Sequence, residues 1–266
     1  MSENEYPLKT TFDISGTLTE TLWFPADKQV KKSSGNNLIF FMIPGNPGVI
    51  DYYTNFLMTI YEEHDKLIDV IGEKFEKEQN VKPKFILAGH SVGGHICKEI
   101  LKARPNHGIE RVYALFPTLQ HILKTPNGAV LNPLLFGEFQ RNISASFVQL
   151  IRTNLFPSVF KLLIKLCTAQ SDPYLSVTTD KLLHGHIVKN ALYMASSEME
   201  SITELEEEFY RSNLNKFVFY FSNGDRWAPL SHYEDMVQRF PEGKILLCDQ
   251  GMPHSFVLGE QFIISN

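Results

Sequence analysis

The sequence predicts an α/β protein with a mostly parallel β-sheet, and three observations point to this class. The chain has 266 residues, of which 43% are hydrophobic and 12% aromatic, so it can bury a large core. Short, continuously apolar runs recur along it, as is typical of strands buried on both faces of a parallel sheet. Stretches with helical periodicity separate these runs, and this alternation predicts right-handed βαβ units. We therefore expect a single domain over residues 1–266.

The expected elements follow from these patterns in chain order. Strands are expected at residues 11–15, 19–24, 38–43, 85–88, 112–116, 217–222 and 245–248. Helices are expected at residues 51–78, 95–103, 155–166 and 232–239. Residues 119–210 interrupt the alternation, and we expect them to form a helical lid inserted into the domain. Because the carboxyl ends of parallel strands meet at one edge of a sheet, the loops that follow the strands should carry the reactive groups.

One such loop contains the pattern G-x-S-x-G, as Gly89-His90-Ser91-Val92-Gly93. In this pattern the serine stands on a sharp turn between a strand and a helix, where larger residues than glycine would clash. An apolar strand precedes the motif and a helix-compatible stretch follows it. Ser91 is therefore the expected nucleophile, although a glycine-rich helix start packed on the sheet would look similar.

A serine hydroxyl is a weak nucleophile that needs a base, and the base needs a carboxylate to orient it. In this architecture the chain order is serine, acid, histidine. His254 follows the last strand directly, whereas His232 falls within an expected helix, so His254 is the expected base. Asp225 is the one carboxylate in the loop after the strand at 217–222, and Asp249 is the alternative acid.

A tetrahedral intermediate also needs two backbone N–H donors. Val92, which follows the nucleophile, should supply one. The other should come from the loop Pro44-Gly45-Asn46-Pro47-Gly48, in which proline has no N–H, so Gly45 or Asn46 remains. We favour Asn46, whose side chain could add a further donor.

Four segments together resemble the lipid droplet-associated hydrolases, a branch of the α/β-hydrolases: FFMIPGNPGVIDYYTNF, LAGHSVGGH, FSNGDRWAP and CDQGMPHSF. The resemblance covers residues 8–262 and is most specific at the PGNPG loop and the acidic residue and aromatic pair after it. It implies the α/β-hydrolase fold, with Ser91, Asp225 and His254 as nucleophile, acid and base. It also implies a lipid-ester substrate, with sterol esters the usual proposal, and the cytosolic face of lipid droplets and endoplasmic reticulum.

Two features depart from this family's pattern. Between Tyr53 and Lys84 the sequence reads mostly as one helix, where the family has an additional strand. The sequence given ends 12 residues after His254, where a closing helix is usual. We therefore expect the strand before the nucleophile strand and the C-terminal helix to be missing or shortened.

The middle of the expected insertion is basic and apolar. Residues 155–166 read as a helix with Pro157 near its start. At helical spacing, one narrow polar stripe runs along it and its two flanks, formed by Asn154, Ser158, Lys161, Lys165 and Thr168. Such a helix is either buried as a lid against the domain or lies flat in a phospholipid monolayer, with residues 147–151 before it. The resemblance favours the monolayer. Six Glu between residues 198 and 208 predict a solvated helix face.

Net charge and the absence of targeting signals limit which partners and locations this protein is expected to have. The net charge of −5 argues against nucleic acid as a partner, and we expect no cofactor and no metal. The N-terminus lacks the pattern of a secretory signal, and no apolar run is long enough for a transmembrane helix. We expect a serine esterase that acts on lipid esters. The alternatives are a weakly active or non-catalytic droplet protein and a soluble short-chain esterase or thioesterase.

Overall fold

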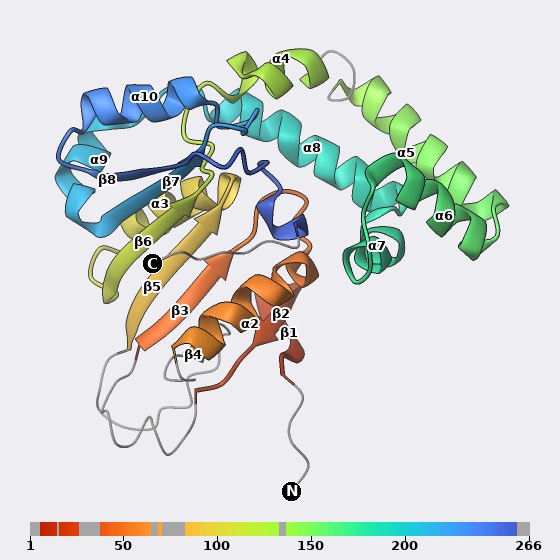
Figure 1. Cartoon of the computed structure of the whole chain (residues 1–266), viewed down its shortest axis with the longest axis horizontal. Coiled ribbons are helices and arrows are strands. Elements are labelled where there is room, and N and C mark those ends of the chain that lie inside the picture. The colour runs from red at the N-terminus through yellow and green to blue at the C-terminus, as the bar shows by residue number, and fades with distance from the viewer. Residues whose placement is uncertain are drawn as a thin grey trace, which may run out of the picture.

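A six-stranded sheet forms the centre of the molecule (Figure 1). The computed structural model describes residues 6–14, 16–26, 38–64, 69–70, 83–132 and 137–259. The strand order is β4-β3-β5-β6-β7-β8, and every neighbouring pair is parallel. The strands are β3 (Leu38–Ile43), β4 (Asp69–Val70), β5 (Lys84–His90), β6 (Ile109–Leu115), β7 (Phe217–Ser222) and β8 (Lys244–Cys248). The predicted α/β class with a mostly parallel sheet is thus confirmed.

Helices cover both faces of this sheet. Alternate residues of each strand face opposite sides, so each strand contributes side chains to both cores. Phe40 and Met42 of β3 pack with α2 (Thr54–Glu63) in one core cluster. Phe217, Phe219 and Phe221 of β7 belong to the opposite cluster. That second cluster includes side chains of α3 (Val92–Ala103), α9 (Glu207–Asn213) and α10 (Leu230–Arg239). Both faces are buried, which explains why the strands read as continuous apolar runs.

The first two strands form a separate antiparallel hairpin. β1 (Leu8–Ile14) pairs with β2 (Thr17–Trp23) in a two-stranded sheet, with Leu8 opposite Trp23. Leu22 and Phe24 bury their side chains in the cluster that contains α2. The hairpin therefore caps one side of the domain instead of extending the central sheet.

The prediction that residues 51–78 are mostly helical is confirmed only in part, because the described residues of this segment include a strand as well as a helix. The segment begins with a 3-10 turn (Ile50–Tyr53), α2 ends at Glu63, and β4 then pairs in parallel with β3. A short apolar run such as the one around Asp69–Val70 does not distinguish strand from helix by its periodicity. Because β4 lies at the edge and β3 pairs directly with β5, the described sheet has no gap beside the nucleophile strand. The prediction that the C-terminal helix is missing or shortened concerns residues 260–266, which lie outside the described residues.

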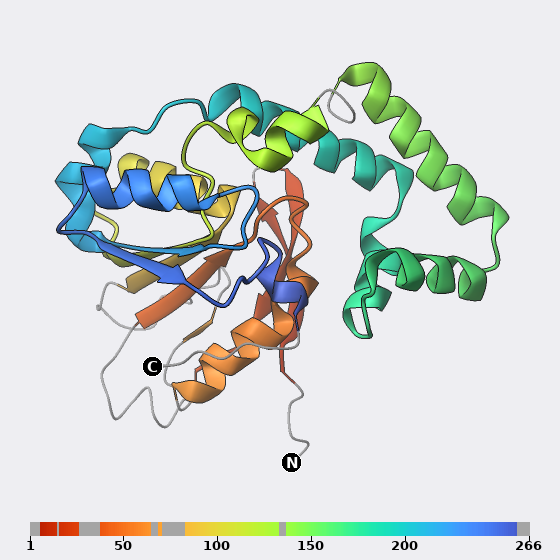
Figure 2. The ribbon, with the colours of Figure 1, turned by 45° about the horizontal axis from the view of Figure 1, so that its top comes forward.

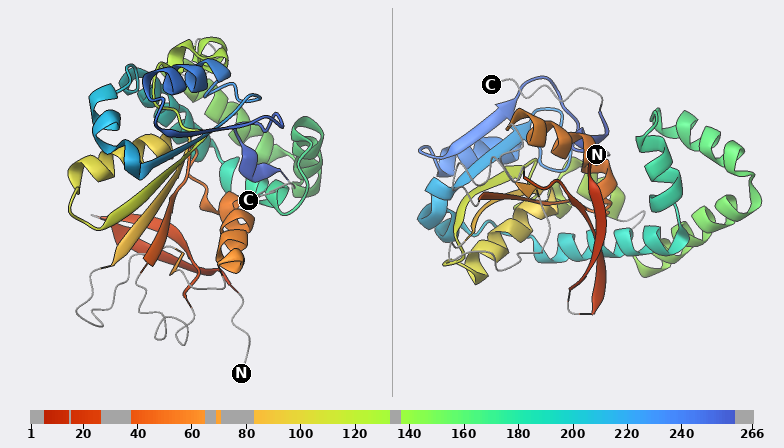
Figure 3. Two further views of the ribbon diagram at one scale, coloured as in Figure 1. Left: turned by 60° about the vertical axis from the view of Figure 1, so that its left-hand side comes forward. Right: turned by 90° about the horizontal axis from the view of Figure 1, so that it is seen from below.

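A helical insertion separates β6 from β7. Its described elements are α4 (Pro126–Leu131), α5 (Glu138–Asn154), α6 (Pro157–Thr168), α7 (Tyr174–Val177), a π-helical turn (Thr178–Leu182), α8 (Gly185–Ser201) and α9. Figures 2 and 3 show α5, α6 and α7 extending away from the sheet, while α8 runs back toward it. Pro157 occupies the first turn of α6, as predicted. None of the helices in the described part of the chain has the length and apolar character needed to cross a bilayer.

The turn at Ile50–Tyr53 ties the insertion to the rest of the domain. The buried carboxylate of Asp51 accepts hydrogen bonds from Lys9 Nζ of β1 at 2.5 Å and from Lys181 Nζ of the π-helical turn at 2.6 Å. The hydroxyls of Tyr52 and Thr178 are 2.7 Å apart. Paired cations hold the pKa of Asp51 below its ordinary value although burial opposes this, so the carboxylate stays charged and holds both lysines.

Candidate active site

Ser91 stands on a strained turn between β5 and α3. Its backbone has φ 57° and ψ −124°, a region that residues with a side chain rarely adopt. The motif glycines make this turn possible: a Cβ on Gly89 would lie 2.2 Å from the carbonyl oxygen of Gly93. A Cβ on Gly93 would lie 2.3 Å from the carbonyl oxygen of Ile43. The sequence therefore folds into a tight elbow that presents the serine at the carboxyl edge of the sheet.

The three residues predicted as nucleophile, base and acid lie side by side. Ser91 Oγ is 2.8 Å from His254 Nε2, and His254 Nδ1 is 2.7 Å from Asp225 Oδ2. An ionised carboxylate only accepts hydrogen bonds, so Nδ1 carries the proton and donates to Asp225. The other ring nitrogen, Nε2, is then free to accept the hydroxyl proton of Ser91. This is the arrangement that activates a serine for nucleophilic attack.

The Asp225 carboxylate is buried, and both of its oxygens accept hydrogen bonds. Its Oδ1 atom accepts hydrogen bonds from the backbone N–H of Trp227 at 2.7 Å and of Ala228 at 2.9 Å. Burial opposes ionisation, but His254 and these two N–H groups outweigh it and hold the pKa of Asp225 below its ordinary value. The alternative acid, Asp249, is exposed, and its main-chain carbonyl accepts from the Asn223 amide. The structure thus pairs the His254 ring with Asp225.

In the PGNPG loop, the two candidate oxyanion donors, Gly45 and Asn46, differ in whether their N–H group already has a hydrogen-bond partner. The N–H of Gly45 donates to the hydroxyl of Tyr53 at 2.9 Å, so it is already used. The main-chain N–H of Asn46 has no hydrogen-bond partner within the described ranges. Val92 is the first residue of α3, whose first N–H groups have no partner in the helix. The side-chain amide of Asn46 is not free, because it donates to the carbonyl oxygen of Ala191 in α8 at 2.9 Å.

Sequence reasoning missed a buried pair beside this site, Tyr53 and His90. The Tyr53 hydroxyl is 2.6 Å from His90 Nδ1, and His90 Nε2 is 2.8 Å from the main-chain oxygen of His254. Burial, followed by the nearby His254, lowers the pKa of His90 to about 3 and keeps its ring neutral. Two features of the sequence could have indicated this pair: the two aromatic residues after the PGNPG loop and the histidine within the G-x-S-x-G motif.

Helix α8 packs against the elbow. Met199 and Ile202 share a buried cluster with Val92, and Trp227 packs against that cluster. Glu198 lies beside them with its Oε1 atom buried and without a hydrogen-bond partner among the described residues. Burial raises the pKa of Glu198 to about 7, partly offset by the Asn46 amide. The helix thus brings apolar groups and one poorly solvated carboxyl group to the loops around Ser91.

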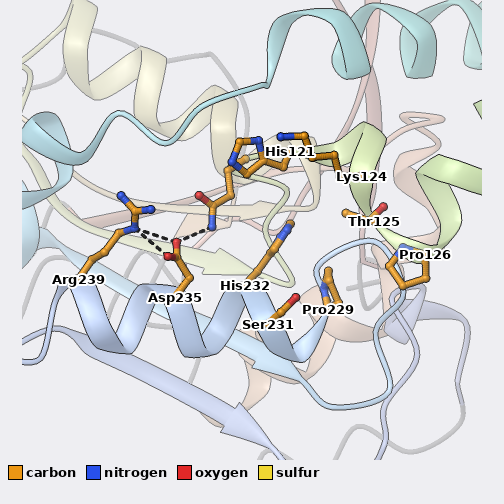
Figure 4. A pocket seen from close by; sticks show the side chains of 10 residues that line it. His121, Lys124, Thr125, Pro126, Pro229, Ser231, His232, Asp235 and Arg239 are labelled. Carbon is orange, nitrogen blue, oxygen red and sulfur yellow. Dashed lines mark hydrogen bonds and ion pairs between the residues drawn. The ribbon is translucent and has the colours of Figure 1, made fainter.

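A pocket of about 470 Å³ lies beside α10. Figure 4 shows the side chains that line it. Asp235 in its wall accepts hydrogen bonds from Gln120 and Arg239. The remaining lining residues are His121, Lys124, Thr125, Pro126, Pro229, Ser231 and His232. This lining contains none of Ser91, Asp225 and His254. Within the part of the chain that the structure describes, no group of three or more His, Cys, Asp or Glu is placed to hold a metal ion.

Comparison with known proteins identifies a family to which this sequence is similar. The profile of a family described as lipid-droplet associated hydrolase matches residues 36–75 and 63–257. The lipid droplet-associated hydrolase of Gallus gallus is 28% identical over 304 residues, covering 97% of this chain and 93% of the relative.

Solved structures establish the fold. A deformylase from Pseudomonas putida S16 superposes with a TM-score of 0.60 at 11% identity, covering 95% of this chain and 96% of the other. An epoxide hydrolase from Vigna radiata superposes with a TM-score of 0.56 at 9% identity, covering 97% and 95%. At such identities the likeness concerns the fold alone, which is the α/β-hydrolase fold.

Proposed function

This chain belongs to the lipid droplet-associated hydrolase family, and from that premise we propose that it is a serine hydrolase of carboxylic esters in lipids. Family and fold together support a lipid hydrolase. The observation that supports the serine mechanism is the unbroken hydrogen-bonded series from Ser91 through His254 to Asp225, with separations of 2.8 and 2.7 Å.

The proposed reaction has two steps. Ser91 Oγ attacks the ester carbonyl while its proton moves to His254 Nε2, and collapse of the tetrahedral intermediate passes that proton to the departing alcohol. Water then attacks the acyl-serine, with His254 taking one water proton and returning it to Ser91 Oγ as the carboxylic acid leaves. The N–H groups of Asn46 and Val92 would hold the oxyanion in both steps. Asp225 would keep the His254 ring in the required tautomer and stabilise its positive charge.

We further propose that the ester is lipidic, with sterol esters as the first candidates. The support comes from the family and from two apolar residues that pack with the elbow, Met199 of α8 and Ile202 just after it. The same geometry would also serve a soluble short-chain esterase or thioesterase. A non-catalytic droplet protein is disfavoured, because a scaffold has no need for a strained serine hydrogen-bonded to an oriented histidine.

Helices α5 and α6 are the proposed attachment to the droplet surface. Both helices expose large apolar side chains to solvent, which are Phe139, Ile143, Phe147 and Leu150 on α5 and Val159, Leu162, Leu163 and Leu166 on α6. Phe156, just before α6, is 79% exposed. The alternative of a lid helix buried against the domain fits poorly, because α6 extends away from the sheet (Figure 3). Exposed apolar faces of this kind suit a helix lying in a monolayer.

The two lysines of α6 take different positions. Lys161 points into the insertion, where its Nζ lies 3.0 Å from Asp172 and 2.8 Å from Ser176. Lys165 is exposed and is the one we assign to the headgroup region. We propose droplets and the cytosolic face of the endoplasmic reticulum as the sites of attachment, since both present a phospholipid layer to such a helix.

A fluorophosphonate probe tests the mechanism directly. The wild-type protein should be labelled covalently, and Ser91→Ala should not be. Equal labelling of both proteins would contradict Ser91 as the nucleophile. Turnover of short esters, triacylglycerols and sterol esters, each compared with the Ser91→Ala background, then decides the substrate class. Turnover of short esters alone would favour the soluble esterase.

A further inference from the structure

The residue pair Tyr53 and His90 lies at the centre of three segments that the proposed reaction depends on. Tyr53 contacts the PGNPG loop through the Gly45 N–H, and His90 immediately precedes Ser91. The His90 ring also contacts the main chain of His254. Tyr53 is 3% and His90 5% exposed, so neither side chain has ready access to solvent.

The directions of these hydrogen bonds follow from chemistry. The carbonyl oxygen of His254 can only accept, so His90 Nε2 carries the ring proton and donates it over 2.8 Å. In a neutral ring the other nitrogen, Nδ1, must then accept, and it accepts from the Tyr53 hydroxyl at 2.6 Å. The hydroxyl oxygen in turn accepts from the Gly45 N–H at 2.9 Å.

The result is one unidirectional chain: Gly45 N–H to Tyr53 Oη–H to His90 Nδ1, and His90 Nε2–H to the His254 carbonyl. The Tyr53 hydroxyl and the His90 ring each donate one hydrogen bond and accept one, so no buried donor of this pair is left over. Bonds arranged head to tail in a low-dielectric interior polarise and strengthen each other. The His90 ring is fixed as well, with Phe256 edge-on at 5.1 Å and the His254 ring at 5.1 Å between centroids.

We propose that Tyr53 and His90 are positioning residues, which hold the oxyanion loop and the catalytic histidine at fixed distances from Ser91. The inference rests on the proposed hydrolysis, since it concerns the same site. Through Gly45 the pair sets the neighbouring Asn46 N–H, and through the His254 carbonyl it sets the backbone that carries the base. Neither residue needs to touch the substrate.

The consequence is a loss of kcat when the chain of hydrogen bonds is broken. Tyr53→Phe keeps the ring and removes only the hydroxyl, so the Gly45 N–H loses its acceptor. His90→Phe removes both ring nitrogens. A displacement of about 1 Å in reacting groups can cost about a hundredfold in rate, so we expect each variant to lower kcat by about ten- to a hundredfold with KM nearly unchanged.

The test uses the full chain and the hydrolysis of p-nitrophenyl butyrate, with Ser91→Ala as the background. Tyr52→Phe is the matched control, because the neighbouring tyrosine is equally buried but its hydroxyl faces Thr178 of the insertion. It should keep kcat within about twofold while losing a comparable buried hydrogen bond. His90→Gln, which can still donate to the His254 carbonyl, should recover part of the kcat that His90→Phe loses.

A double-mutant cycle shows whether Tyr53 and His90 act through one shared series of hydrogen bonds or through two independent contacts. If the residues act as one chain, Tyr53→Phe with His90→Phe should lower kcat no further than the worse single variant. A wild-type kcat in both single variants would overturn this inference but not the proposed function. So would a double variant whose loss of kcat equals the product of the two single losses. If His90→Phe does not fold, kcat of Tyr53→Phe against Tyr52→Phe decides. Absence of Ser91-dependent turnover in the wild type would overturn the proposed function and this inference with it.

Discussion

The side-chain amide of Asn46 donates a hydrogen bond of 2.9 Å to the main-chain carbonyl of Ala191, which lies 145 residues later in the chain. This bond joins the loop that follows β3 to helix α8 of the insertion. It leaves the main-chain N–H of Asn46 as the group available to an oxyanion. The side chain of this residue would therefore orient the loop, while its backbone would serve the reaction.

Asn46→Ala should lower kcat by less than about tenfold, because alanine retains the backbone N–H. Loss of an oxyanion donor costs about a hundred- to a thousandfold, so a fall of that size would show that the side chain itself is the donor. Asn55→Ala is the matched control, since the Asn55 amide also reaches the insertion, at the Tyr174 hydroxyl 2.9 Å away. Steady-state kinetics on a soluble ester and thermal melts of both variants make the comparison.

Asp225→Asn should lower kcat by about ten-thousandfold with little change in KM. An amide in this position no longer requires the proton to stay on His254 Nδ1, so Nε2 is not held ready to accept from Ser91. Asp249→Asn should keep nearly full activity, because Asp249 is exposed and His254 is hydrogen-bonded to Asp225. Equal losses in the two variants would return Asp249 to consideration as the acid.

Glu198→Gln should raise stability at pH 8 and leave it nearly unchanged at pH 4. The pKa of Glu198 rises on folding from its ordinary value of 4.5 to about 7, because burial disfavours the charged carboxylate. Between these values the folded state holds more protons than the unfolded state, so wild-type stability falls as pH increases through this window. Glutamine removes that dependence.

Denaturant unfolding at several pH values measures the effect of Glu198→Gln. The exposed neighbour Glu200, changed to Gln, is the control and should leave the slope of stability against pH as it is in the wild type. An unchanged slope in Glu198→Gln would show that Glu198 ionises in the folded protein as it does in water.

Changing Leu162, Leu163 and Leu166 to Ser should release the protein from lipid droplets without unfolding it. These side chains are 56%, 37% and 76% exposed, so they contribute little to the core. Fully burying a leucine in an apolar phase is worth about 1.5–3 kcal/mol, more than the roughly 1 kcal/mol that one lysine gains at an anionic surface. Lys161→Gln with Lys165→Gln should therefore weaken binding only mildly.

Flotation with phospholipid-coated triacylglycerol droplets measures this release, and probe labelling of Ser91 reports on the fold. Leu18, Leu123 and Leu246 changed together to Ser are the control, since they are exposed to 76%, 44% and 50% on other surfaces. If the α6 variant floats like the wild type, or loses probe labelling, the helix is not the attachment.

The sequence was sufficient to predict that Ser91, Asp225 and His254 would come together, because each follows a strand and parallel strands end at one edge of the sheet. It could not predict the hydrogen bonds of Asn46 or the pair of Tyr53 and His90. Those depend on how loops far apart in the chain meet, and neither periodicity nor spacing carries that information.

The acidic run at residues 198–208 shows the same limit. The sequence predicts a solvated helix face, but the run spans the end of α8 and the start of α9. Glu198 is partly buried beside the elbow, and Glu206 forms ion pairs with Lys98 and Lys102 of α3. The density of charge along the chain predicted exposure, but the lysines that donate to the Glu206 carboxylate belong to α3, about a hundred residues earlier in the chain.

The contacts of Asp51 and Tyr52 bear on how the insertion can be transplanted. Besides the contacts of Asn46 and Asn55, the insertion contacts the rest of the domain through Lys181 on Asp51 and Thr178 on Tyr52. The polar contacts at this turn therefore depend on two distant parts of the chain. A lid grafted from another hydrolase without those two residues would leave a buried carboxylate with one cation instead of two. Chimeras built to exchange substrate specificity should therefore replace the turn at Ile50–Tyr53 together with the lid, or retain Thr178 and Lys181 in the graft.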